Sequence, residues 1–319
     1  MRASVLLLLL LTGCGGCGLT EAAHLLRDAT SPAADLREGV TESIDRKAGE
    51  RVRMYQPDGA AQDAPVVVLV AGAVEDGIDD PRFVALARAL ARRGLVVATP
   101  DLLSLRLLRI DAEDPARIAR VAASFTEAER VSLAGVSVGG SYCLIAAGRA
   151  EVRDRIACVL SFGAYAHLEL LLRGWLTAPP PDAKGVMDPL GEGRRAVLQG
   201  NRDRIPPALY DTVVASNAPL SKEQAHEALA GMADDLQALT PLANPLPRAR
   251  VFLLHGKDDP IVPSSEAVSL ERWYTKKSVR HRLLVTDLFA HVDRDGGDPG
   301  VWESMPLLRF VSAFLSAAR

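Results

Sequence analysis

At 319 residues the chain is long enough for one large domain or two of average size, and 48% apolar with 24% charged residues is ordinary for a globular protein. A formal net charge of −3, without any dense run of Lys and Arg, excludes the electrostatic signature of a nucleic-acid partner. The sequence has no His-Glu-x-x-His pair, no clustered Cys and His, and no glycine-rich phosphate loop followed by Lys, so we expect neither a metal nor an organic cofactor.

The first residues have the features of a signal peptide. Arg2 precedes an apolar run, Val5 to Leu11, that is too short to cross a bilayer. The following Leu11-Thr12-Gly13-Cys14 resembles the bacterial lipoprotein box, in which the signal is removed before a cysteine that carries lipid. We therefore expect residues 1–13 to be the signal peptide and Cys14 to be lipidated, the alternative being a secreted protein without lipid.

This resemblance implies a bacterial envelope protein that is anchored to a membrane outside the cytoplasm. In a cell with two membranes it favours the outer one, because Gly15 rather than Asp follows the cysteine. Residues 14–50 are polar, rich in Ala and poor in large apolar side chains, which predicts a tether with one short helix near residues 21–27.

Beyond residue 50, short apolar runs alternate with helical patterns. We expect buried parallel strands at residues 66–70, 95–99, 131–134, 157–162, 251–254 and 283–286, and an antiparallel edge strand at 51–55. Asp80 and Pro81 predict the start of a helix that Gly94 ends, and a last helix is expected at about 302–318. Such alternation predicts an α/β domain with a doubly wound, mostly parallel sheet over residues 51–319.

One interval, between Phe162 and Val251, breaks the alternation. It contains helical segments at residues 167–175, 208–216 and 221–232, the last opened by a Ser221-x-x-Gln224 capping box, and no run typical of a strand. We expect residues 166–248 to form a helical insertion between the sixth and seventh strands. It either caps the carboxyl ends of the strands or packs elsewhere as an extension.

The stretch Val131–Gly148 contains the only strong catalytic motif of the chain. Gly135-Val-Ser137-Val-Gly139 lies between a buried apolar run and a helix of small residues, the strand–turn–helix context in which a serine is held in a strained turn. Glycines are needed on either side because the turn leaves no room for bulk. An unactivated serine is a poor nucleophile, so it needs a base within hydrogen-bond reach and a carboxylate that orients this base.

Among the six histidines, only His291 has a suitable position for the base. It follows the last expected strand at the carboxyl edge of the sheet, where α/β sites lie. The other histidines lie in the expected tether, in the insertion, before the acid loop or at the amino end of the last strand: His24, His167, His226, His255 and His281. The acid is expected after residues 251–254, where Asp258 and Asp259 are available.

The pattern His255-Gly256-x-x-Asp259-x-x-Val262-Pro263 resembles one that is widespread among serine hydrolases of the α/β-hydrolase superfamily. The resemblance extends from about Arg51 to the C-terminus and assigns the acid to Asp259 rather than Asp258. It also implies an oxyanion hole made of the backbone N–H groups of Ala73 and Val138. The chain departs from the family in one place, since Ala71-Gly72 replaces the usual His-Gly after the first parallel strand.

Together these features predict a serine hydrolase that cleaves carboxylic esters or related acyl compounds through Ser137, His291 and Asp259 and an acyl-enzyme. An acyltransferase or a lipase with the same triad, and an inert surface binding lipoprotein, are the alternatives. A peptidase is disfavoured because peptidases of this fold often carry an additional propeller domain, for which the chain is too short. Cys143 and Cys158 lie in apolar segments and are expected to be buried free thiols.

Overall fold

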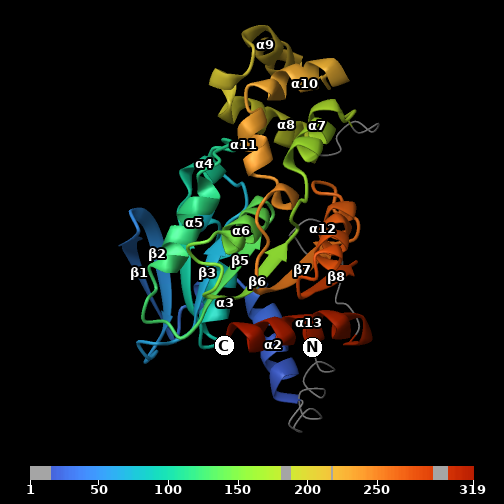
Figure 1. Ribbon diagram of the computed structural model, residues 1–319. Coiled ribbons are helices and arrows are strands. Elements are labelled where there is room, and N and C mark those ends of the chain that lie inside the picture. The colour runs from blue at the N-terminus through green and yellow to red at the C-terminus, as the bar shows by residue number, and fades with distance from the viewer. Residues whose placement is uncertain (1–15, 181–187, 217, 290–300) are drawn as a thin grey trace.

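The computed structural model describes residues 16–180, 188–216, 218–289 and 301–319 (Figure 1). The predicted signal peptide, Cys14 and His291 lie outside the described residues. Within them, the chain forms one eight-stranded sheet in the order β1-β2-β4-β3-β5-β6-β7-β8. The strands are β1 Val40–Lys47, β2 Glu50–Pro57, β3 Val66–Val70, β4 Val96–Pro100, β5 Val131–Val136, β6 Ile156–Phe162, β7 Arg250–Gly256 and β8 His281–Thr286.

The sheet is parallel from β4 to β8, and β1 and β2 are antiparallel additions beyond β4. Its central strands are apolar on both sides because helices cover both faces. In β3, for example, Val66, Val68 and Val70 belong to one core cluster, whereas Val67 and Leu69 belong to the other. The predicted doubly wound, mostly parallel sheet is therefore observed.

Helices α2 Gly16–Ala29, α3 Pro81–Ala91 and α13 Val301–Ala318 contribute to the core on one face of the sheet. Helices α5 Asp114–Ala123, α6 Val138–Gly148 and α12 Ser264–Lys276 contribute to the core on the other face, and the short α4 Leu103–Arg106 lies beyond β4. Asp80 caps α3 as predicted, because its side chain accepts hydrogen bonds from the N–H groups of Arg82 and Phe83.

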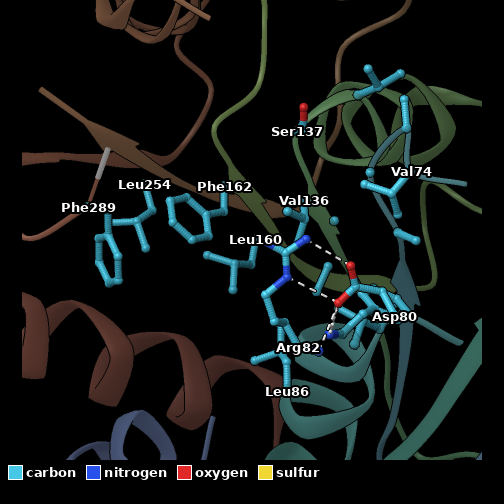
Figure 2. A pocket seen from close by; sticks show the side chains of 18 of the residues that line it. Val74, Asp80, Arg82, Leu86, Val136, Ser137, Leu160, Phe162, Leu254 and Phe289 are labelled. Atoms are coloured by element: carbon cyan, nitrogen blue, oxygen red, sulfur yellow. Dashed lines mark hydrogen bonds and ion pairs between the residues drawn. The ribbon is translucent and has the colours of Figure 1, made fainter. Parts of the chain in front are cut away.

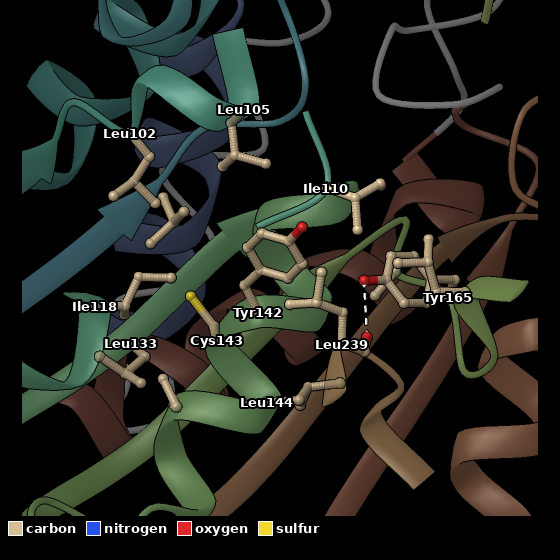
Figure 3. Packing of buried hydrophobic residues seen from close by; sticks show 14 of the residues in the cluster. Leu102, Leu105, Ile110, Ile118, Leu133, Tyr142, Cys143, Leu144, Tyr165 and Leu239 are labelled. Carbon is tan, nitrogen blue, oxygen red and sulfur yellow. Dashed lines mark hydrogen bonds between the residues drawn. The ribbon is translucent and has the colours of Figure 1, made fainter. Parts of the chain in front are cut away.

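The α5–α6 face carries a large apolar cluster around Tyr142, Cys143 and Tyr165 (Figure 3). Tyr165 buries its ring and donates a hydrogen bond of 3.0 Å to the carbonyl oxygen of Leu239, which ties the end of the insertion to the sheet. Cys143 lies in this cluster, whereas Cys158 lies in the cluster on the opposite face. Both are buried free thiols, as predicted. Burial raises the pKa of both, that of Cys158 to about 11.

The interval between β6 and β7 is helical, as predicted. It contains α7 Leu168–Thr177, α8 Pro189–Gly200, α9 Pro207–Ser216, α10 Lys222–Ala230 and α11 Ala233–Ala238. The capping box of α10 is present, since the Ser221 hydroxyl accepts from the Gln224 N–H and the Gln224 side chain accepts from the Ser221 N–H. Figure 1 shows the insertion stacked on one end of the molecule, away from α2 and α13.

The prediction of a tether over residues 14–50 is wrong for the described part, which begins at Gly16. Helix α2 packs against α3 and α13, with Ala22 buried and Asp28 paired with Arg93 at 2.8 Å. Strand β1 pairs along its whole length with β2, so β1 and not the predicted strand at 51–55 forms the edge of the sheet. One buried helix face and a mostly exposed edge strand need few large apolar residues, which is why composition indicated a tether.

Candidate active site

Ser137 lies at the junction where β5 ends and α6 begins. Its backbone has φ 53° and ψ −125°, a conformation that is costly for a residue with a side chain. The conformation is held in part by a hydrogen bond of 2.6 Å from the Ser137 N–H to the carbonyl oxygen of Phe162 on β6. Figure 2 shows the Ser137 hydroxyl at the tip of this turn.

The two glycines of the motif make this turn possible for steric reasons. A Cβ at Gly135 would lie 2.3 Å from the carbonyl oxygen of Gly139, and a Cβ at Gly139 would lie 2.3 Å from the carbonyl oxygen of Ala71. Neither contact is tolerable, and backbone atoms cannot move away as a flexible side chain would. Glycine is therefore required at both positions.

Ala73 and Val138, the residues expected to supply the oxyanion hole, both lie next to Ser137. Ala73 is in the loop after β3, Val138 is the first residue of α6, and both line one cavity together with Ser137. Within the described part of the chain, neither N–H group donates an intramolecular hydrogen bond. The loop passes close to the serine, since a Cβ at Gly72 would lie 3.3 Å from the Ser137 Cβ. Two unused donors thus lie beside the hydroxyl.

The loop after β7 distinguishes the two candidate acids. Asp259 is buried, and its Oδ1 accepts hydrogen bonds of 2.8 Å from the N–H groups of Ile261 and Val262. Asp258 is exposed. Ile261, in the same loop, lines the cavity that Ser137 lines. A carboxylate held by two amides has a fixed orientation, which an acid that orients an imidazole needs.

His255 belongs to the framework of this loop. It is buried, and its Nε2 lies 2.8 Å from the carbonyl oxygen of Val262 and 3.4 Å from Oδ2 of Asp259. A carbonyl oxygen can only accept a hydrogen bond, so Nε2 of His255 carries the hydrogen and donates it to Val262 in this loop. The sequence pattern contained His255 but gave no indication of this contact with Asp259.

The predicted base, His291, lies outside the described residues. The described residues just before it are close to the acid loop and the cavity. The Lys257 N–H donates to the carbonyl oxygen of Thr286, which joins the acid loop to the end of β8. Phe289, two positions before His291 in the sequence, lines the cavity.

The cavity beside Ser137 has a volume of about 490 Å³ and a mostly apolar lining. Residues of the insertion form part of its wall, among them Trp175 on α7 and Gly193 on α8. The indole Nε1 of Trp175 donates a hydrogen bond of 2.8 Å to the carbonyl oxygen of Ile261, so the insertion is also tied to the acid loop. The insertion is therefore a cap on the site and not an extension packed elsewhere.

The cavity wall also carries charged side chains. Arg82 is paired with Asp80 at 2.8 Å, and Figure 2 shows this pair on the side of Val136 away from the Ser137 hydroxyl. The Arg82 guanidinium lowers the pKa of Asp80 against the opposing effect of burial. No group of three or more His, Cys, Asp or Glu that could hold a metal ion occurs among the described residues. In the same part of the chain, no helix has the length and apolar character needed to cross a membrane.

No family model and no curated protein matches the sequence. Several solved structures have a similar fold. Dipeptidyl peptidase 4 from Porphyromonas gingivalis is 12% identical with a TM-score of 0.54, over 87% of this chain and 35% of that one. The acylaminoacyl peptidase from Pyrococcus horikoshii is 13% identical with a TM-score of 0.52, over 87% of this chain and 40% of that one.

Est1E from Butyrivibrio proteoclasticus, solved with ferulic acid bound, is 15% identical with a TM-score of 0.54, over 86% of this chain and 98% of that one. The chain thus spans less than half of the two peptidases but nearly all of Est1E. At these identities the similarity concerns the fold, and it confirms the predicted α/β-hydrolase fold.

Proposed function

We propose that this protein with an α/β-hydrolase fold is a serine hydrolase of carboxylic esters or related acyl compounds, with Ser137 as nucleophile, Asp259 as acid and His291 as base. The observation that carries the proposal is the positive φ of Ser137 at the strand–helix junction, beside the unused N–H groups of Ala73 and Val138. Backbone strain of this kind persists where function requires it, and here it presents a hydroxyl to an apolar cavity.

The proposed reaction has two steps that share one set of groups. Ser137 Oγ attacks the acyl carbon while His291 takes the hydroxyl proton, and the N–H groups of Ala73 and Val138 stabilise the negative oxygen. The intermediate collapses, and the leaving alcohol takes the proton from His291. Water then attacks the acyl-enzyme and gives its proton to His291, which returns a proton to Ser137 Oγ as the acid leaves. Asp259 stabilises the imidazolium in both steps.

The lining of the cavity favours an ester over a peptide as substrate. The cavity wall is mostly apolar, which suits an uncharged acyl group better than a polar peptide backbone. An acyltransferase would share every residue of this mechanism and differ only in the acceptor of the acyl group.

The test of the proposal is the reaction of the serine. Wild type should react with a fluorophosphonate probe and hydrolyse a small activated ester. Ser137→Ala should abolish labelling and lower kcat by about 10⁵–10⁶. Ser161→Ala is the matched control, because it removes a buried hydroxyl that has no hydrogen-bond partner in the described structure. Full activity and unchanged labelling in Ser137→Ala would overturn the mechanism.

We also propose that the enzyme is anchored to a bacterial envelope membrane through lipid on Cys14. The support is Leu11-Thr12-Gly13-Cys14 after an apolar segment. The described residues begin with helix α2 at Gly16, two positions after the proposed lipid. Membrane and active site would then be joined by a helix of the domain itself instead of a long tether.

A further inference from the structure

The cavity that Ser137 lines extends well beyond the groups needed for the reaction. It continues along the face of the sheet that α2, α3 and α13 cover. In the view of Figure 2, Ser137 lies at one end and Leu86 of α3 towards the other, with Val136 and the Asp80–Arg82 pair between them. The space therefore leads from the nucleophile towards a layer of helices on the far side from the cap.

This extension has apolar walls on all the elements that form it. Strands β3, β5 and β6 and helices α2, α3 and α13 each contribute apolar side chains, among them Leu69, Ala134, Leu160, Leu25, Leu86 and Phe314. Most of these side chains belong to the core cluster of this face or pack against it. A cavity in that position lies within an apolar layer, so a water molecule in it would have few hydrogen-bond partners.

Two of the three charged residues that line the cavity, Asp80 and Arg82, pair with each other beside the extension, and the third, Glu192, lies on α8 of the cap. The Arg82 guanidinium donates to Asp80 through Nε at 3.2 Å and through a terminal nitrogen at 2.8 Å. Asp80 is held in turn by the N–H groups at the start of α3. A positive and a negative group therefore meet on the wall, and the favourable occupant remains apolar.

We propose that this extension binds the unbranched alkyl chain of a fatty acyl substrate, whose carbonyl carbon lies at Ser137. The inference rests on the proposed function, since continuity with the nucleophile is what identifies the occupant as an acyl chain. A volume of about 490 Å³ is within the usual range for small-molecule sites, and a lining that reaches from Ser137 to α2 suits a long group. Helix α2 is then part of the substrate site, because Leu25, Leu26 and Ala29 line the same space.

The first test measures the preference for chain length. Transfer of each methylene group from water to an apolar site increases binding about fourfold, so kcat/KM should rise steeply from butyryl to dodecanoyl esters in the wild type. Ala29→Phe and Leu86→Trp fill the extension and should lower the dodecanoyl-to-butyryl ratio of kcat/KM by roughly tenfold or more. Ala313→Phe on α13 is the matched control, since Ala313 is partly buried beside the same core but does not line the cavity, and it should keep the wild-type ratio.

The second test does not depend on catalysis. Dodecanoate should bind to Ser137→Ala in calorimetry, and adding Ala29→Phe or Leu86→Trp should weaken its binding about tenfold, whereas Ala313→Phe should not. A fatty acid with a diazirine at the end of its chain should label peptides of α2 or α13 in the wild type.

The outcomes separate this inference from the proposed function. Dodecanoate binding that responds to Ala29→Phe, without any ester hydrolysis, would uphold the chain site and overturn the proposed reaction. Hydrolysis that depends on Ser137 but shows an unchanged chain-length ratio in both filling variants would overturn the chain site alone. Labelling of α7 and α8 in the cap, and not of α2 or α13, would overturn it as well.

Discussion

Ser137 has a backbone conformation that only its surroundings can maintain. Its φ of 53° is stabilised by the hydrogen bond to Phe162 and by the close approach of Gly139 to the loop after β3. The serine side chain takes part in neither of these backbone contacts. The strain is thus maintained by the scaffold and does not depend on the serine hydroxyl.

The first prediction compares the two adjacent aspartates. Asp259→Asn should lower kcat by about 10⁴, because it weakens the stabilisation of the imidazolium. It should also lower the free energy of unfolding by about 1–2 kcal/mol, since the amide N–H₂ places a second donor about where Oδ2 lies, 3.4 Å from the Nε2 of His255 that already donates to the Val262 carbonyl oxygen. Ester kinetics and urea unfolding of the same preparations measure both effects.

Asp258→Asn is the control for this pair. Asp258 is exposed and next to Asp259 in the same turn, so the substitution should leave both kcat and stability near wild type. If Asp258→Asn were the damaging change and Asp259→Asn the mild one, the acid would have to be reassigned.

At the scale of elements, helix α7 joins the cap to the acid loop through one side chain. Trp175 lines the cavity and donates to the carbonyl oxygen of Ile261, whereas Leu171 on the same helix is buried but does not line the cavity. Substitutions at these two residues can therefore distinguish an effect on the cavity from an effect on the packing of the cap.

The second prediction uses this difference. Trp175→Phe should change the preference among acetate esters that differ in the alcohol group, because it alters the cavity wall on the cap side, away from the proposed acyl-chain extension, and removes the hydrogen bond to the acid loop. Leu171→Ala should lower stability by about 2–4 kcal/mol and reduce activity on all esters equally, since it creates a hole in the cap. Equal losses on all esters in Trp175→Phe would contradict the assignment of α7 to the site.

The start of α5 contains a buried carboxylate outside the site. Asp114 accepts a hydrogen bond of 2.5 Å from Ser104 and pairs with Arg117 at 2.6 Å. Burial raises the pKa of Asp114 to about 6, although these two partners act in the opposite direction. An aspartate in the unfolded chain has a pKa of about 3.9, so the folded state holds the proton more tightly.

The third prediction follows from the sign of this shift. Between pH 4 and 6 the folded state binds more protons at Asp114 than the unfolded state does, so its contribution to stability falls as the pH rises. The difference in free energy of unfolding, Asp114→Asn minus wild type, should therefore increase by on the order of 2 kcal/mol from pH 4 to pH 7. Urea unfolding of both proteins at each pH measures it.

Asp203 provides a control of opposite sign. A hydrogen bond from Arg109 lowers the pKa of this exposed carboxylate to about 2, so its contribution to stability is lost as the pH falls. The free energy of unfolding of Asp203→Asn should consequently fall slightly relative to that of wild type as the pH rises. If the stability of Asp114→Asn relative to wild type changed with pH in the same direction as that of Asp203→Asn, burial would not raise the pKa of Asp114.

At the scale of the whole molecule, α2 closes one face of the domain. It contacts α13 and α3, and Arg319 at the end of the chain donates to Glu21 of α2 at 3.0 Å. The described beginning and end of the chain therefore pack together on the sheet (Figure 1). A segment in this position contributes to global stability, which a tether does not.

The fourth prediction tests this packing with one substitution at two alanines. Ala22 is fully buried in α2, whereas Ala34 is exposed. Ala22→Asp should lower the free energy of unfolding by about 3 kcal/mol or more, because it buries an unpaired charge. Ala34→Asp should change it by less than about 0.5 kcal/mol. If both variants unfolded like wild type, residues 16–29 would not be part of the cooperative domain.

The fifth prediction concerns the proposed anchor. Cys14→Ser should move the protein from the detergent phase to the aqueous phase in a bacterial host, because several acyl chains on one cysteine hold a protein firmly at a membrane. Mass spectrometry of the mature N-terminal peptide identifies the lipid directly. Wild-type protein that stays in buffer and carries no lipid would exclude the anchor.

The sequence predicted those strands and helix caps whose patterns involve only neighbouring residues. The apolar runs of β3 to β8, the Asp80 cap and the Ser221 capping box are readable in sequence because strand patterns and cap chemistry involve only neighbouring residues, although β8 is half-buried and not buried as expected. Helix α8 was missed for a physical reason. Its Gly191 and Gly193 have low helix propensity, but Gly193 packs against the ring of Trp175, where a Cβ would lie only 3.1 Å from the ring.

The sequence by itself also predicted the turn at Ser137, because the need for Gly135 and Gly139 shows within five adjacent residues. Its resemblance to a family pattern named Asp259 rather than Asp258 as the expected acid. Only the tertiary structure decided which aspartate is buried, that residues 16–47 belong to the domain, and that a cavity leads from Ser137 to α2. These features depend on contacts between segments that are distant in the chain. Composition and periodicity describe each segment alone and contain no information about which segment will cover it.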